Sequence, residues 1–134
     1  MPEKKTLKRV RADKRAGKSA STQAGEFVKE EIEHIREGKH GARSTAQAIA
    51  IGLSKARRAG VKLKAPARGK TSARTRQRAE RDYQQGQARS HKVSPRRAKA
   101  SLQKLKRESS RAASHAALSK HAKAVARERA KARA

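Results

Sequence analysis

The large apolar side chains of this 134-residue chain are concentrated in residues 27–60, and this limits the folds that the chain can adopt. Two apolar stripes with helical spacing lie there: Phe27, Val28, Ile32 and Ile35 in the first, and Ile49, Ala50, Leu53 and Ala56 in the second. Aromatic residues make up only 1% of the chain, so a large core with aromatic anchors is excluded. The sequence therefore predicts a small all-α module in which a glycine-rich loop joins two helices.

Glycine and serine residues mark the ends of the predicted helices. We expect a first helix over residues 3–16, a second from a cap at Ser21 or Thr22 to residue 37, and a third over residues 45–59. Gly17, Gly38 and Gly60 each follow a helix, where a left-handed backbone favours glycine. Ser44 and Gln47 have the spacing of a capping box, in which each side chain bonds a free amide of the helix start.

Charge density rises in the second half of the chain. Residues 1–65 carry 17 basic and 7 acidic side chains, net +10, whereas residues 66–134 carry 21 and 4, net +17. We expect a small helical module over 1–63, a linker over 64–72, and a basic, alanine-rich tail over 73–134, partly helical and partly disordered. Two helices are predicted in the tail. The first has a cap at Thr71 or Ser72 and ends at Gln85, before Gly86, and the second has Ser94 as its cap and Pro95 as its first residue. Ser109 and Ser110 are expected to interrupt the second helix.

The net charge of +27 indicates a polyanionic partner, since a small domain needs a net charge of only roughly 2–8 for solubility. Phe27 and Tyr83 are the only aromatic residues, so base stacking is not the main mechanism that we expect. The mechanism that we expect is neutralisation of backbone phosphates, which does not discriminate between base sequences. We predict a histone-like, nucleoid-associated DNA-binding protein of the cytoplasm.

Three parts of the chain are expected to contact phosphates. The first is the loop over residues 38–44, which ends at a helix N-terminus where free amides attract anions. The second is the basic end of the third helix, and the third is the arginine-rich tail. The candidate nucleic-acid-binding residues are Lys39, His40, Arg43, Lys55, Arg57, Arg58, Lys62, Arg74, Arg76, Arg78, Arg96 and Arg97. Gln47 offers an alternative, adenine readout from the third helix, although the capping box already explains that residue.

Metal, cofactor and catalytic chemistry are not expected. The chain has no cysteine. None of its five histidines, His34, His40, His91, His115 and His121, is three or four residues from another, the spacing of a metal-binding pair on a helix. No set of nucleophile, base and orienting group is apparent, so the protein is not predicted to be an enzyme. The longest apolar stretch falls far short of the ~20 residues that span a bilayer, so no membrane partner is expected.

Two other functions remain open. The first is an RNA-binding or ribosome-associated protein, because phosphate neutralisation does not separate RNA from DNA. The second is a helical protein–protein interaction module, in which the stripe of Phe27, Ile32 and Ile35 binds a partner or a second copy of the chain and the charge serves solubility.

Three segments resemble an uncharacterised family of small basic bacterial proteins: STQAGEFV at residues 21–28, IREGKHG at residues 35–41 and QAIAIGLSKARRAG at residues 47–60. The resemblance covers roughly residues 3–63, and members of that family carry similar Arg- and Ala-rich extensions. It implies a bacterial, cytosolic setting. The tail is also similar in composition to the tails of histone-like bacterial proteins.

Overall fold

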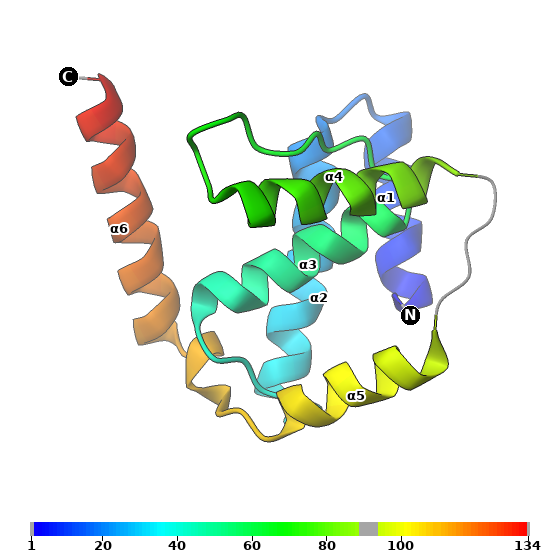
Figure 1. Cartoon of the computed structure of the whole chain (residues 1–134), viewed down its shortest axis with the longest axis vertical. Coiled ribbons are helices and arrows are strands. Elements are labelled where there is room, and N and C mark those ends of the chain that lie inside the picture. The colour runs from blue at the N-terminus through cyan, green and yellow to red at the C-terminus, as the bar shows by residue number, and fades with distance from the viewer. Residues whose placement is uncertain (1, 89–93, 134) are drawn as a thin grey trace. The chain divides into compact units, whose positions relative to one another are not determined.

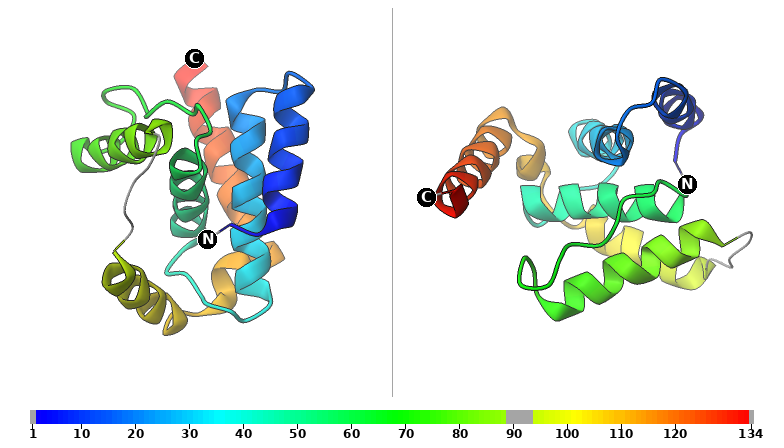
Figure 2. Two further views of the ribbon diagram at one scale, coloured as in Figure 1. Left: turned by 90° about the vertical axis from the view of Figure 1, so that its right-hand side faces the viewer. Right: turned by 90° about the horizontal axis from the view of Figure 1, so that it is seen from above.

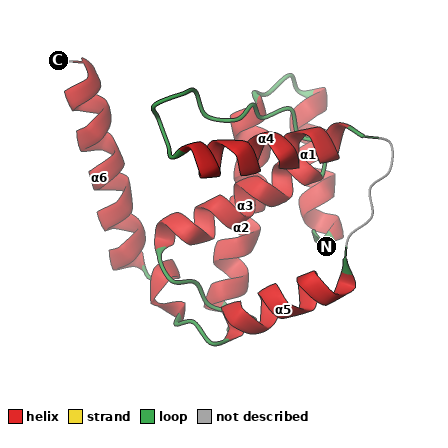
Figure 3. Cartoon of the chain, in the orientation of Figure 1, coloured by secondary structure: helices red, strands yellow, loops and turns green. Residues whose placement is uncertain are grey.

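The fold is all-α. A computed structural model describes residues 2–88 and 94–133, and within these ranges there are helices, turns and an isolated bridge between Arg68 and Thr71, but no strand (Figures 1 and 3). The helices are α1 (Lys4–Arg15), α2 (Ala20–Arg36), α3 (Thr45–Arg58), α4 (Ala73–Gln87), α5 (Pro95–Lys106), the 3-10 helix η1 (Ser110–Ala113) and α6 (His115–Arg133). His91 lies outside the described residues.

The chain forms two compact units. Unit 1 comprises Met1–Glu31 and Ala50–Val93, and unit 2 comprises Ile32–Ile49 and Ser94–Ala134. Helices α2 and α3 therefore each contribute one part to both units. The two units do not coincide with the predicted division into a module (1–63), a linker (64–72) and a tail (73–134). The reason is that segments far apart in the chain share a core. Whether residues 1–63 form a module by themselves stays a prediction.

The core of unit 1 is built around Phe27, which is 0% exposed. Ala24, Ala56 and Val61 are buried with it, and Leu7 and Val10 of α1 pack against this cluster. The crossing of α2 and α3 is close, because a Cβ added at Gly52 would lie 2.6 Å from the Cα of Val28. Small residues thus let the few large apolar side chains form a core.

Unit 2 has a smaller core in which alanines replace large side chains. Ile35 is 0% exposed and packs with Ala42, Ala48, Ala112 and Ala113. Two side chains tie η1 to the helices: Arg36 Nε donates to the Ala113 carbonyl (2.9 Å), and Thr45 Oγ1 donates to the Ala112 carbonyl (2.7 Å). Phe27 and Ile35 are enclosed in these two cores and Ile32 is half-buried, and docking of a partner or second copy on this stripe stays a prediction.

The three glycines expected to end helices do so. Gly17, Gly38 and Gly60 have φ of 73°, 78° and 99°, respectively. At Gly60 the amide donates to the Arg57 carbonyl and the next amide, of Val61, donates to Ala56 (3.1 and 3.0 Å), which is the Schellman pattern. The same pair of bonds follows α1 and α2. These predictions are confirmed.

Serine caps are also confirmed at most helix starts. Ser72 and Ser94 accept from Thr75 N–H (3.2 Å) and Arg97 N–H (3.3 Å), and Pro95 is the first residue of α5. Ser44 Oγ accepts from Gln47 N–H (3.1 Å), as a capping box requires. The return bond differs, because Gln47 Oε1 accepts from the amide of Arg43 rather than from that of Ser44 (2.5 Å).

Two predicted helix ends are wrong. Helix α2 starts at Ala20, and its cap is Ser19, whose Oγ accepts from the Thr22 amide (3.2 Å). Gly86 does not end α4, which continues to Gln87. Instead the backbone of Gly86 lies against the carbonyl of Arg57, where a side chain would overlap the oxygen. The glycine is explained by this close packing and not by a turn.

Candidate nucleic-acid interface

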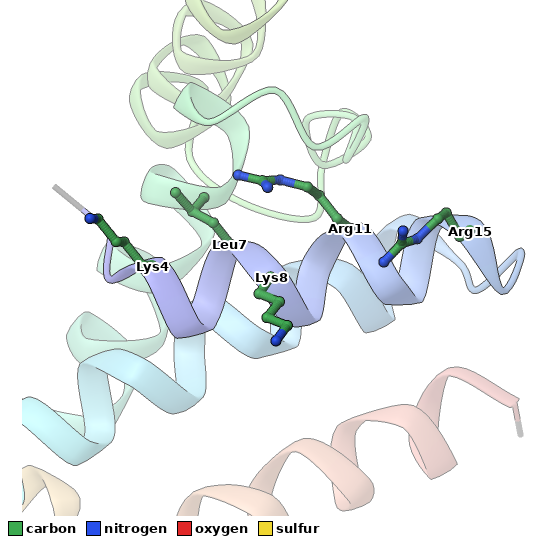
Figure 4. A pocket seen from close by; sticks show the side chains of 5 residues that line it. All are labelled: Lys4, Leu7, Lys8, Arg11 and Arg15. Atoms are coloured by element: carbon green, nitrogen blue, oxygen red, sulfur yellow. The ribbon is translucent and has the colours of Figure 1, made fainter.

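Helix α1 carries a row of four cations on its outer face. Lys4, Lys8, Arg11 and Arg15 are spaced i, i+4, i+7 and i+11, which places them on one side of a helix. All four are exposed, and Figure 4 shows them projecting from successive turns, beside Leu7 with which they line a shallow depression. Within the described part of the chain their side chains make no hydrogen bond or ion pair. We call these four residues the α1 stripe.

The inner face of α1 explains why the α1 stripe is not neutralised. Thr6 and Asp13 are buried on that face, where Thr6 Oγ1 donates to Glu30 (3.0 Å). Asp13 pairs with Lys18 at 3.3 Å, beyond the end of the helix. The acidic groups near α1 are thus engaged inside unit 1, and the positive potential of the outer face remains.

Helix α4 repeats the arrangement with Arg74, Arg78 and Arg81, spaced i, i+4 and i+7 and all exposed. We call these three residues the α4 stripe. Ala79 is buried on the inner side of α4. Asp82, which flanks the stripe, accepts hydrogen bonds from Ser54 Oγ (2.7 Å) and Arg58 Nε (3.2 Å). Two of the arginines predicted in this region, Arg74 and Arg78, therefore lie together. Arg76 is half-buried and points elsewhere on the helix.

Helices α5 and α6 carry exposed cations and no buried residue. Arg96 and Arg97 lie in the first turn of α5 and are exposed, as the sequence analysis assumed. On α6, Lys120, Lys123, Arg127 and Lys131 follow the spacing of a single face. Residues 94–133 hold 13 lysines and arginines against two glutamates, so their net charge is +11.

The loop over residues 38–44 was predicted to contact phosphate through free amides, and the amides of Gly41 and Ala42 are not free. Its amides are already used within unit 2: Gly41 N–H donates to the Leu105 carbonyl (2.9 Å) and Ala42 N–H to the Ser109 carbonyl (3.1 Å). A side chain at Gly41 would overlap the backbone of Glu108. The close backbone approach that this glycine permits is thus made by the segment after α5, and not by a ligand.

The three loop residues proposed for phosphate contact occupy different environments. His40 is 7% exposed, its Nδ1 lies 2.9 Å from the Gly41 carbonyl oxygen, and its ring meets that of His34 edge to face at 6.2 Å. Lys39 pairs with Glu37 at 3.2 Å, and Arg43 is exposed. His40 therefore has a structural position, which corrects its assignment as a phosphate ligand, whereas Arg43 remains accessible.

The basic end of α3 is also used largely inside unit 1. Arg57 is 7% exposed and donates from Nε to the Leu63 carbonyl (3.0 Å) and from Nη2 to the Lys64 carbonyl (3.2 Å). Desolvation lowers the pKa of Arg57 from its ordinary value, and the Asp82 carboxylate acts in the opposite direction. Arg57 fixes the turn after α3, and we withdraw it from the phosphate-contacting set.

The other three cations of this cluster differ in their availability. Lys55 forms an ion pair with Glu31, whose side chain is fully buried. Arg58 pairs with Asp82 but keeps 49% of its side chain exposed. Lys62 is exposed and makes no side-chain contact of this kind in the described part of the chain. The structure thus leaves Lys62, and in part Arg58, for an external partner.

The α1 stripe was not among the residues predicted from the sequence to contact phosphates. The signal was present as four cations at i, i+4, i+7 and i+11, but the helix was evaluated for its apolar residues, Leu7 and Val10.

Searches of protein-family models, of curated proteins and of solved structures gave no match to this chain. Of the helices in residues 2–88 and 94–133, none has the length and apolar character needed to traverse a bilayer.

Proposed function

We propose that this protein binds nucleic acid, and DNA in the first place, through phosphate contacts with little sequence specificity. The observation that carries the proposal is the α1 stripe, a row of four exposed cations on one helix face. The nearby acidic residues Asp13 and Glu30 are buried and bonded to Lys18 and Thr6. Over 11 residues at about 1.5 Å each, the stripe is about 16 Å long, which matches several successive phosphates of one strand.

The division of charge within the chain supports a polyanion over a solubilising role. Glu26, Glu31 and Asp82 form ion pairs with Arg9, Lys55 and Arg58 inside unit 1, which leaves the excess cations on outer helix faces. Surface charge placed only for solubility would mix both signs. Rows of one sign instead raise the local concentration of an anionic polymer and release its counterions on binding.

The chain offers little for reading bases. Phe27 is enclosed in the core and Tyr83 is half-buried, so the aromatic surface available for stacking is small. Gln47, the residue that could pair with adenine, accepts a hydrogen bond from Arg43 N–H in the capping box. We therefore propose DNA binding with low sequence specificity, as in histone-like proteins, and we propose the bacterial nucleoid as the location of the protein.

We also propose that α5 and α6 are ordered partly by their partner. Neither helix has a buried residue, and both carry many like charges. Helix α5 has only 12 residues, a length at which a helix without tertiary packing is marginal in water. In the 19-residue α6, like charges at i and i+4, as in Lys123, Arg127 and Lys131, are destabilising. Phosphates would remove this repulsion, so the tail would gain helix on binding.

A salt titration tests the proposal. The affinity of the full chain for a fluorescent 20-base-pair DNA duplex of arbitrary sequence is measured by anisotropy at several salt concentrations. We expect a linear fall of log K with log salt, with a slope of roughly −0.9 for each phosphate neutralised, and similar affinity for an unrelated sequence. A slope near zero, or absence of binding in dilute buffer, would refute it. Preference for an RNA duplex in competition would assign the protein to RNA.

A further inference from the structure

Unit 1 carries cationic rows on its two outer helices. Its four helical segments follow the order α1, α2, α3, α4 across the unit, and Figure 2 shows α1 and α4 at the two outer positions in both views. The α1 stripe and the α4 stripe both lie on helix faces directed away from the buried residues of their own helices. Unit 1 is therefore a two-sided cationic body.

The two outer helices are fixed to the helices between them by specific contacts. On one side Thr6 Oγ1 and the Glu3 amide donate to Glu30 of α2, at 3.0 and 2.6 Å. On the other side Asp82 of α4 accepts from Ser54 of α3, and Gly86 lies against the carbonyl of Arg57. These contacts hold both stripes in place on one compact unit.

We infer that unit 1 bridges two separate DNA duplexes, one along the α1 stripe and the other along the α4 stripe. The inference rests on the proposed function, since it assumes that the stripes bind phosphates. Packed helices lie about 8–10 Å apart, so two outer helices with at least one helix between them are separated by about 16–20 Å or more. That is about two Debye lengths at physiological salt, so repulsion between the two duplexes is largely screened.

One duplex laid along one row does not reach the other, because α2 and α3 lie between the two helices that carry the rows. A single bound duplex leaves the other row without counter-charge, and that row then attracts a second duplex. The protein would thereby join DNA segments, an activity that phosphate binding through a single face does not provide.

Energy transfer between two labelled duplexes tests the inference. Donor- and acceptor-labelled 20-base-pair duplexes are mixed in excess over the full-length protein, and transfer is measured at about 0.15 M salt, where the Debye length is about 8 Å. Three variants each remove three charges and lower the net charge from +27 to +24: R74Q/R78Q/R81Q in the α4 stripe, K8Q/R11Q/R15Q in the α1 stripe, and, as the matched control, K5Q/R9Q/K18Q, whose cations pair with Glu3, Glu26 and Asp13. All nine residues are exposed, so circular dichroism and thermal unfolding should confirm an intact fold.

We expect transfer with the natural protein and with the K5Q/R9Q/K18Q control, and a fall to the level of the duplexes alone with either stripe variant, while each variant still binds a single duplex by anisotropy. Bridging is overturned if the natural protein binds DNA without transfer. Its assignment to the two stripes is overturned if a stripe variant keeps transfer, or if the K5Q/R9Q/K18Q control loses it as completely as the stripe variants do, which indicates bulk charge. Absence of all binding refutes the proposed function instead.

Discussion

Gly86 lies directly against the backbone carbonyl of Arg57, so that α4 approaches the end of α3 with no side chain between them. The amide of Gly60 is also near, at 3.1 Å from the position that a Cβ of residue 86 would take. This contact determines how closely α4 packs against the end of α3, and it thereby fixes the position of the α4 stripe on unit 1.

Gly86→Ala should therefore destabilise the protein although alanine favours helix. The added methyl group must displace backbone, and overpacking of this kind costs about 1–3 kcal/mol or more. Gly25→Ala is the matched control, because Gly25 is also helical and has nothing within 4 Å of the new Cβ. It should stabilise by roughly 0.5–1 kcal/mol. Urea denaturation measures both, and equal effects would contradict the close packing at Gly86.

The local signals of this sequence predicted helix ends well. Gly17, Gly38 and Gly60 adopt the left-handed backbone that ends a helix, and Ser72 and Ser94 cap the helices that follow them. These features depend on a few neighbouring residues, because the bonds concerned join amides and carbonyls within one turn. An all-α fold followed from them, and from the spacing of the apolar residues.

The functions of Gly41 and Gly86 could not be predicted in this way. Both are explained by a backbone segment distant in sequence, Glu108 for Gly41 and Arg57 for Gly86. Ala112 and Ala113 were equally hidden, because alanines in a basic tail suggest an exposed helix, whereas here they lie in the core of unit 2. The same holds for the loop over residues 38–44, because the sequence does not show that the amides of Gly41 and Ala42 donate to the Leu105 and Ser109 carbonyls. Phosphate contact by this loop stays a prediction.

Arg57 and Arg58 provide a test of which cations serve the fold and which serve the ligand. Arg57→Met leaves the carbonyls of Leu63 and Lys64 without their donor and should cost about 1–3 kcal/mol of unfolding free energy. Arg58→Met breaks a largely exposed pair with Asp82 and should cost about 0–1 kcal/mol.

DNA binding of the same two variants should show the reverse order. Under conditions where both are folded, Arg57→Met should keep the salt slope of the natural protein, while Arg58→Met should reduce its magnitude by at most about one phosphate contact, roughly 0.9. Anisotropy titrations at four salt concentrations give these slopes. A larger loss of slope for Arg57→Met would restore that residue to the phosphate-contacting set.

The α1 stripe should dominate the salt dependence of binding among the cations of α1. The variant K8Q/R11Q/R15Q removes three cations that have no partner among the described residues, and its slope should fall by about 2.7, at roughly 0.9 for each contact. The control K5Q/R9Q/K18Q removes three cations that pair with Glu3, Glu26 and Asp13. Its slope should change by less than one contact. Equal changes would show that only the total charge matters.

The order of α5 depends on its cap more than on packing, and this gives a test of folding on binding. Ser94 accepts from the Arg97 amide at 3.3 Å, and α5 has no buried residue. Loss of a serine cap costs about 0.5–2 kcal/mol, a large amount for a helix with so little tertiary support. Ser94→Ala should therefore lower the ellipticity at 222 nm of the free protein, and saturating duplex DNA should recover the loss, because phosphates neutralise Arg96, Arg97 and their neighbours. The gain of ellipticity on DNA binding should be larger for Ser94→Ala than for the natural chain. If DNA leaves the ellipticity of both proteins unchanged, the helices of the tail form independently of the partner, and coupled folding is rejected.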